Sequence, residues 1–258
     1  MLTIRKYVMA ESLSQAYDLY QNKNNTIIGG MLWLKMQDRT VDTAIDLSNL
    51  GLNTIEETEN TYEIGAMVTL RDLELHSGLN TLTGNAFTAC VKPIVGVQFR
   101  NLATVGGSVY GRYGFSDLLT LLLAMNADVV LYKNGIVNIH DFVKMPYTRD
   151  IVVKVIVSKN NGNVYYTSFR NTKTDFPVLT CCVYHHDNHT GACIGARPGK
   201  ALDFVMNEEE TVTDYANRIH ESCPFGSNMR SSASYRGKLC RNLTEYDIRQ
   251  LQKGESSC

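Results

Sequence analysis

The sequence predicts an α+β protein in which two small α/β subdomains precede an antiparallel sheet with helices. Short apolar runs alternate with helix-like segments through the first half, as in α/β units. The second half has β runs separated by Asn- and Gly-rich turns, and then two helical segments. We expect the chain to divide into residues 1–148, with subdomains of about 1–55 and 56–148, and residues 149–258.

The composition excludes several classes of protein. Of the 258 residues, 44% are hydrophobic and 20% charged, which is typical of a globular protein. Lys and Arg total 25 against 26 Asp and Glu, so no overall field attracts nucleic acid or an anionic membrane. No apolar run has the length of a membrane span, and Met1 to Ala10 lacks the core of a signal peptide. We therefore expect a cytoplasmic protein.

Cysteine and histidine give no sign of a metal site. The seven cysteines are odd in number, form no CxxC pair, and are expected to be reduced core or surface residues rather than iron–sulfur or zinc ligands. They are Cys90, Cys181, Cys182, Cys193, Cys223, Cys240 and Cys258. His185, His186 and His189 border a polar turn, which favours a solvated loop.

The expected elements follow from capping and periodicity. Ser12 to Gln15 has the form of a capping box and predicts a helix from Leu13. Thr69 is a candidate N-cap, and either Ser116 or Asp117 caps the apolar helix that follows. Strands are expected at Thr26–Ile28, Thr43–Leu47, Tyr62–Ala66, and in a hairpin Val129–Tyr132/Ile136–Ile139 whose Asn134-Gly135 suits a type I′ turn.

The second half is expected to be a meander followed by two helices. Its strands are Ile151–Val157, Val164–Phe169, Val178–Tyr184 and Ala192–Gly195. The helices run from Thr211 to Cys223 and from about Ala233 to Leu251.

Two Gly-Gly turns are the candidate functional feature. Gly29-Gly30 closes the run Thr26–Ile28, and Gly106-Gly107 lies in the stretch 100–108. Glycine lets backbone N–H groups approach an anion, so the two turns could hold the two ends of one diphosphate. The alternative is that both are tight turns required by packing. Neither pair satisfies GxGxxG, and residues 106–113 lack the Lys and hydroxyl of a Walker A loop, so nucleotide hydrolysis is excluded.

Single residues near these turns have two interpretations each. Asp117 either caps a helix or accepts hydrogen bonds from a sugar. Trp33 follows the first glycine pair, where a core position is favoured over a cofactor platform. No catalytic triad, nucleophile elbow or acidic pair is visible, so we name no catalytic residue.

Five segments resemble a known family. They are residues 28–32, 64–73, 100–119, 169–177 and 230–236. In these segments the chain is similar to the FAD-binding, or medium, subunit of the molybdenum hydroxylases, the group that contains xanthine dehydrogenase and carbon monoxide dehydrogenase. It implies an FAD domain of two α/β subdomains, like that of vanillyl-alcohol oxidase, followed by a smaller domain with an antiparallel sheet and helices.

The resemblance also implies an FAD site. Residues 27–34 would hold the diphosphate through backbone N–H groups, the second turn would add the donors of Thr104, Gly107 and Ser108, and Asp117 would bind a sugar or ribityl hydroxyl. Val95 would approach the flavin, Val152 would pack on a ring, and Arg170 would face the flavin's polar edge. The full set is Ile27, Ile28, Gly29, Gly30, Met31, Leu32, Val95, Thr104, Gly106, Gly107, Ser108, Asp117, Val152 and Arg170.

The implied function is electron transfer within a complex. A [2Fe-2S] small subunit would pass electrons to FAD and onward to NAD or another acceptor, while a molybdopterin large subunit would hydroxylate the substrate. The segment Tyr110–Phe115 departs from the family pattern and bears on what the flavin can reach. The alternatives are a stand-alone flavin oxidase of the same fold and a flavin-free assembly subunit.

Overall fold

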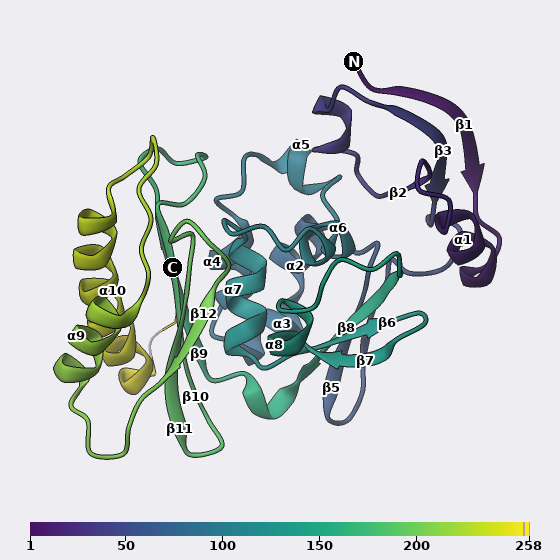
Figure 1. The fold of residues 1–258 in the computed structure, drawn as a ribbon. Helices are drawn as coiled ribbons and strands as arrows, with labels where there is room; N and C mark the ends of the chain where they lie inside the picture. The colour runs from purple at the N-terminus through teal and green to yellow at the C-terminus, as the bar shows by residue number, and fades with distance from the viewer. Residues whose placement is uncertain (255, 258) are drawn as a thin grey trace.

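The computed structural model describes residues 1–254, 256 and 257, and three sheets organise them. In Figure 1 the N-terminal sheet, the central sheet with its helices, and the C-terminal sheet follow one another across the molecule. The C-terminal sheet is covered by helices on both faces, α9 and α10 on one and α4 and α7 on the other. The predicted α+β class is confirmed.

The first subdomain is a parallel sheet with one covering helix. Its elements are β1 (Thr3–Met9), α1 (Leu13–Tyr20), β2 (Thr26–Ile28), the 3-10 helix η1 (Leu34–Met36) and β3 (Thr40–Asp46), with strand order β1-β3-β2. Helix α1 begins where predicted, because the Ser12 hydroxyl accepts a hydrogen bond from the backbone N–H of Gln15 at 3.1 Å. Strand β2 ends directly before the first Gly-Gly turn.

The central subdomain packs helices against an antiparallel sheet of order β4-β5-β8-β6-β7. Its elements are β4 (Ile55–Glu57), β5 (Thr61–Gly65), α2 (Leu70–Leu75), α3 (Ser77–Leu82), α4 (Ala86–Val91), α5 (Val97–Arg100), α6 (Val105–Tyr110), α7 (Asp117–Ala124), β6 (Asp128–Leu131), β7 (Gly135–Asn138), α8 (Ile139–Phe142) and β8 (Val152–Ser158). Thr69 caps α2 in a capping box with Asp72, as expected.

The C-terminal part is a second antiparallel sheet of order β12-β11-β10-β9. Its elements are the 3-10 helix η2 (Lys159–Asn161), β9 (Val164–Phe169), β10 (Leu179–His186), β11 (His189–Gly195), β12 (Leu202–Val205), α9 (Val212–Ser222) and α10 (Ala233–Lys253). Cys181 and Val183 of β10 face the α9/α10 side, whereas Cys182 and Tyr184 belong to the core around α7. Burial of both faces explains why the strand is apolar nearly throughout.

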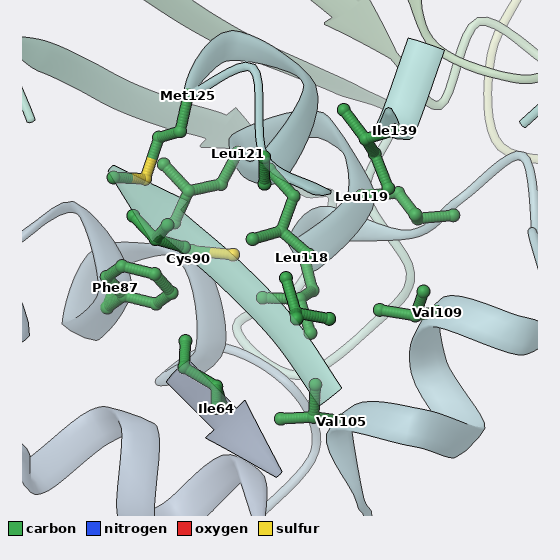
Figure 2. Packing of buried hydrophobic residues seen from close by; sticks show 14 of the residues in the cluster. Ile64, Phe87, Cys90, Val105, Val109, Leu118, Leu119, Leu121, Met125 and Ile139 are labelled. Carbon is green, nitrogen blue, oxygen red and sulfur yellow. The ribbon is translucent and has the colours of Figure 1, made fainter. Parts of the chain in front are cut away.

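The largest core lies around α7, which is buried along its whole length. Figure 2 shows Leu118 and Leu121 of α7 among Phe87 and Cys90 of α4, with Val105 of α6 close by. Helices α6 and α7 therefore have their positions fixed by packing on one side. Residues at the N-terminal ends of both helices line the cavity that is described in the next section.

Two details of the sequence prediction are wrong. Residues 151–157 do not begin the meander, because β8 pairs with β5 and β6 in the central sheet. The turn at Asn134-Gly135 is not type I′: only Gly135 has positive φ (68°), and Leu131 pairs with Gly135 across a loop of residues 132–134. Both errors concern long-range pairing or turn geometry that local patterns do not specify.

The division of the chain at residue 148 stays a prediction. Since β8 completes the central sheet, we propose that the boundary lies after it, near η2. Among the residues described, no helix combines the length and apolarity needed to cross a membrane.

Candidate functional site: a cavity between the two Gly-Gly turns

A cavity of about 310 Å³ lies where three distant segments meet. It is lined from the end of β2 to η1, from the segment between Ile94 and Leu118, and from Arg170 to Pro177. Most of the predicted cofactor-binding residues line it: Ile27, Ile28, Gly29, Gly30, Met31, Leu32, Val95, Thr104, Gly107, Ser108, Asp117 and Arg170.

Gly106 and Val152 lie outside the cavity lining. The Gly106 N–H donates to the carbonyl of Ala66 at 2.8 Å, and a Cβ at Gly106 would lie 2.8 Å from the Ala66 Cβ. Gly106 is therefore a glycine because the backbones pack closely. Val152 is buried in the hydrophobic core at the start of β8.

The first Gly-Gly turn offers a run of uncommitted donors. Within the described chain, no backbone N–H from Gly29 to Leu34 donates a hydrogen bond to another protein group. Met31 has a left-handed φ of 57°, which is uncommon for a non-glycine residue. Successive N–H groups in such a turn can form an anion-binding concavity. This turn fits the predicted diphosphate.

The second turn has its first N–H groups committed inside the protein. Thr104 caps α6, and the four N–H groups that follow donate to Val68 O, Ala66 O, the Thr104 hydroxyl and Thr104 O, at 2.9, 2.8, 3.2 and 3.0 Å. The Ser108 hydroxyl also donates to Thr104 O, at 2.9 Å. The predicted backbone donors at Gly107 and Ser108 are thus already engaged, whereas the Thr104 hydroxyl hydrogen has no acceptor among the described residues.

Gly107 nevertheless leaves space toward the cavity. A Cβ at Gly107 would meet only the Thr104 hydroxyl oxygen, at 3.2 Å. A Cβ at Gly29, on the other turn, would lie 2.7 Å from the same oxygen. The Thr104 hydroxyl therefore stands between the two turns: Gly29 packs closely against it, and the open space lies on the Gly107 side.

Asp117 forms an ion pair with Arg170 at the edge of the cavity. Both are buried, and the Asp117 Oδ1 atom accepts from an Arg170 Nη and, at 2.6 Å, from the Tyr166 hydroxyl. Burial raises the pKa of Asp117 above its ordinary value, while the Arg170 charge opposes the shift. Ser116 provides the N-cap of α7, so the capping interpretation of Asp117 is wrong.

Arg170 keeps one donor without a partner. One Nη donates to Asp117 and the other to Asp175 O, at 2.5 Å, but the buried Nε–H has no acceptor in the described chain. An unsatisfied buried donor costs roughly 1–3 kcal/mol. A ligand acceptor would remove that cost, which fits the predicted place of Arg170 beside the flavin.

Val95 is strained where it lines the cavity. Its φ of 49° is an outlier for a β-branched residue, and its side chain is half exposed. Arg100 supports this segment by donating to Ile94 O at 3.1 Å, while its guanidinium pairs with Glu74 at 2.7 Å. The geometry of this loop thus depends on a buried ion pair whose two residues do not line the cavity.

Aromatic side chains form one wall of the cavity. Trp33 stacks on Phe176 at 5.6 Å, and Tyr113 stacks on Phe115 at 5.1 Å. Trp33 is 39% exposed, so the core position expected for it is wrong. Sequence reasoning missed Phe176 as a lining residue, although it lies within a segment that resembles the family.

Arg112 does not reach the cavity despite its position in the chain. It is buried, donates to Met145 O at 2.6 Å, and lies over the Phe142 ring at 4.0 Å. The departure from the family pattern at residues 110–115 therefore places aromatic rings, and not this cation, at the cavity.

The histidines and cysteines lie elsewhere. His186 is half-buried, with Nε2 3.1 Å from Ala124 O, so it is less solvated than expected. The part of the chain that the structure describes has no group of three or more His, Cys, Asp or Glu able to hold a metal. Six cysteines are buried free thiols whose pKa is raised by burial, and Cys258 lies outside the described residues.

Two curated proteins are similar to the chain over most of its length. The chain is 29% identical over 267 residues to the glyceraldehyde dehydrogenase medium chain of Sulfolobus acidocaldarius, covering 92% of this chain and 95% of the relative. It is 28% identical over 226 residues to YgfM of Escherichia coli K12, covering 84% and 78%.

Solved structures share the fold. One is a carbon monoxide dehydrogenase of Hydrogenophaga pseudoflava (TM-score 0.84, 20% identity, 96% of this chain and 97% of the other). Another is the quinoline 2-oxidoreductase of Pseudomonas putida 86 (TM-score 0.84, 18% identity, the same coverage).

The family model described as "FAD binding domain in molybdopterin dehydrogenase" matches residues 2–159. That range contains both Gly-Gly turns and Asp117, and it identifies FAD as the cofactor. The chain belongs to the family of FAD-binding proteins of the molybdopterin dehydrogenases.

Proposed function

We propose that this chain is the FAD-binding medium subunit of a molybdenum hydroxylase complex, with a [2Fe-2S] small subunit and a molybdopterin large subunit as partners. The observation that carries the proposal is the run of uncommitted N–H groups from Gly29 to Leu34, in one cavity with the open side of Gly107. The medium-chain relative, matched over nearly its whole length, supports the subunit assignment.

The two turns have different roles in holding the diphosphate. The first supplies backbone donors, whereas the second supplies the Thr104 hydroxyl and the space beside Gly107. Charge-assisted hydrogen bonds to phosphate are stronger than neutral ones, so uncommitted N–H groups gain most when a diphosphate binds. We therefore assign the main diphosphate contacts to residues 29–34.

Asp117 and Arg170 form the polar end of the site. Asp117 is assigned to a ribityl or sugar hydroxyl, and the Nε–H of Arg170 to an acceptor on the flavin. Their ion pair keeps both side chains in place and prevents an unpaired charge from being buried. Bound FAD supplies the redox chemistry, and the chain's own residues bind and orient it.

The electron path extends beyond this chain. Electrons would arrive from the [2Fe-2S] clusters and leave for NAD or another acceptor, with substrate hydroxylation on the large subunit. No catalytic acid or base is assigned, because Asp117 and Arg170 are engaged with each other in an ion pair. The buried free thiols support a cytoplasmic location, where cysteines stay reduced.

The absorption spectrum tests the cofactor assignment. We expect a flavin spectrum from the chain purified alone or with the subunits that co-purify, and FAD rather than FMN on release. A protein that is colourless and takes up no added FAD, whether purified alone or with other subunits, would overturn the proposal and favour a flavin-free assembly subunit. Loss of the flavin absorption on addition of NADH would support NAD as the acceptor. Turnover of a small donor without other subunits would instead favour a stand-alone oxidase.

A further inference from the structure

Arg149, outside the cavity, ties the first subdomain to the central one. Its guanidinium donates to three carbonyls in the segment that joins α1 to β2: Tyr20 O, Asn22 O at 2.7 Å and Asn25 O at 2.7 Å. It also lies 4.1 Å from the centre of the Tyr20 ring. In return, the Gln21 side chain donates to Arg149 O at 3.1 Å. One side chain thus holds the end of α1 and the residue before β2.

A second connection joins the same end of α1 to α6. The Tyr110 hydroxyl, on the last residue of α6, donates to Thr148 O at 2.7 Å and lies 2.9 Å from the Tyr20 hydroxyl. Since the Tyr110 proton is used on Thr148, Tyr20 donates to Tyr110. Tyr20, Tyr110 and Arg149 therefore form one connected network, which we call the latch.

The latch is connected to both Gly-Gly turns through short, regular elements. Strand β2 has three residues between the segment held by Arg149 and Gly29. Helix α6 has Gly107 near its start and Tyr110 at its end. Hydrogen-bonded helices and strands transmit changes of position along the chain, so the latch geometry, together with the direct packing of Gly30 on the Leu102 carbonyl, sets how far apart the two turns lie.

Apolar contacts alone do not fix that distance. Ile151 packs with the core of the first subdomain, and partly buried Met67 and Tyr132 contact it. Such contacts are non-directional and tolerate sliding, whereas hydrogen bonds to three carbonyls have defined directions. We propose that Arg149, outside the cavity lining, and the hydroxyl of Tyr110, a residue that also lines the cavity, set the spacing of the two turns, so that FAD affinity depends on the latch. The inference rests on the proposed function.

FAD titration of latch variants tests this. Arg149→Gln removes the guanidinium, and Tyr110→Phe removes one hydroxyl. The FAD dissociation constant should be measured well below each variant's unfolding temperature. We expect it to rise by about tenfold or more for Arg149→Gln and less for Tyr110→Phe, because misplacing binding groups by even about 1 Å is costly. Unchanged FAD affinity in folded Arg149→Gln would overturn the inference, even if its unfolding temperature falls.

Two comparisons separate positioning from general stability. In the double variant, the loss of FAD affinity should be smaller than the sum of the two single losses, because both changes affect the same spacing between the turns. A loss equal to that sum would contradict a shared latch. Arg218→Gln is the matched control: Arg218 lies over the Tyr215 ring at 5.3 Å and donates to Val205 O at 2.8 Å, outside the cavity lining. It should leave FAD affinity unchanged.

If Arg149→Gln does not fold, a more conservative variant can test the inference. Arg149→Lys keeps the charge but cannot direct bonds to three carbonyls, so it should fold and still bind FAD more weakly than the wild type. Wild-type affinity in Arg149→Lys would overturn the inference. A wild-type chain that takes up no FAD would instead refute the proposed function, which keeps the two failures distinct.

Discussion

The two Gly-Gly turns look alike in sequence but have different properties in the structure. In the first, the backbone N–H groups from Gly29 to Leu34 have no acceptor within the described chain. In the second, they are engaged at the start of the helix that Thr104 caps, partly with Ala66 and Val68 of a distant loop. A glycine pair therefore predicts close approach of the backbone, but tertiary pairing decides whether its donors remain available to a ligand.

Each turn also combines two uses of glycine. Gly30 and Gly106 are packed against backbone, and a Cβ at Gly30 would lie 1.9 Å from Leu102 O. Gly107 faces only the Thr104 hydroxyl and the cavity. The first kind of glycine is required for folding, and the second leaves space for a ligand. Substitutions at the two kinds of position should therefore separate stability from FAD binding.

The largest effect is expected for Gly30→Ala. The added methyl group would overlap the Leu102 carbonyl, which belongs to the backbone and cannot move away as a side chain could. We expect a loss of about 3 kcal/mol or more in the free energy of unfolding, together with loss of FAD binding. Denaturant unfolding measures the first and flavin content the second. A variant with wild-type stability would show that the two turns are not in contact through Gly30.

Gly107→Val should abolish FAD retention while the chain still folds. Its side chain would enter the space beside the Thr104 hydroxyl that we assign to the diphosphate. Circular dichroism and the unfolding midpoint check the fold, and the flavin absorption of the purified chain checks the cofactor. Unchanged flavin content would place the diphosphate away from the second turn and leave the first turn as the sole anion site.

Asp117→Asn should weaken FAD binding by about 1–3 kcal/mol, because a ligand hydroxyl loses a charged acceptor. It should also lower stability, since the buried Arg170 guanidinium loses its counter-charge. Asp214→Asn is the matched control, with the same substitution in the first turn of α9. Equal FAD affinity in Asp117→Asn and the wild type would limit Asp117 to a structural role.

Local signals in the sequence were enough to find most elements, and the family resemblance pointed to a part of the cavity lining. Ser12 and Thr69 predict the starts of their helices correctly, because capping depends on neighbours within a few residues. The pairing of β8, the exposure of Trp33 and the hydrogen bond from the Gly106 N–H to Ala66 O depend on distant partners, so no local pattern contains them. The latch at Arg149 is of the same kind: its acceptors are more than a hundred residues away in the chain.

The smallest effect on FAD affinity is expected from substitution of Asp247. This residue is buried between α10 and the C-terminal sheet, away from both turns. The Thr167 hydroxyl donates to one carboxyl oxygen at 2.7 Å, and the other has no partner among the described residues. Burial raises the pKa of Asp247 from 3.8 to about 8. The folded chain thus keeps a proton that the unfolded chain releases.

Stability should therefore fall as pH rises from about 4 to about 8, by at most about 1.4 kcal/mol per pH unit. Above pH 8 this contribution is lost in full, and below pH 4 it is fully present. Asp247→Asn cannot ionise, so its free energy of unfolding should exceed that of the wild type at pH 8, and most of this advantage should be lost by pH 5. Denaturant unfolding at both pH values measures the difference, and FAD affinity should not change. A change in FAD affinity would mean that the C-terminal sheet also affects FAD binding, through β9 and Arg170, the residue that follows β9.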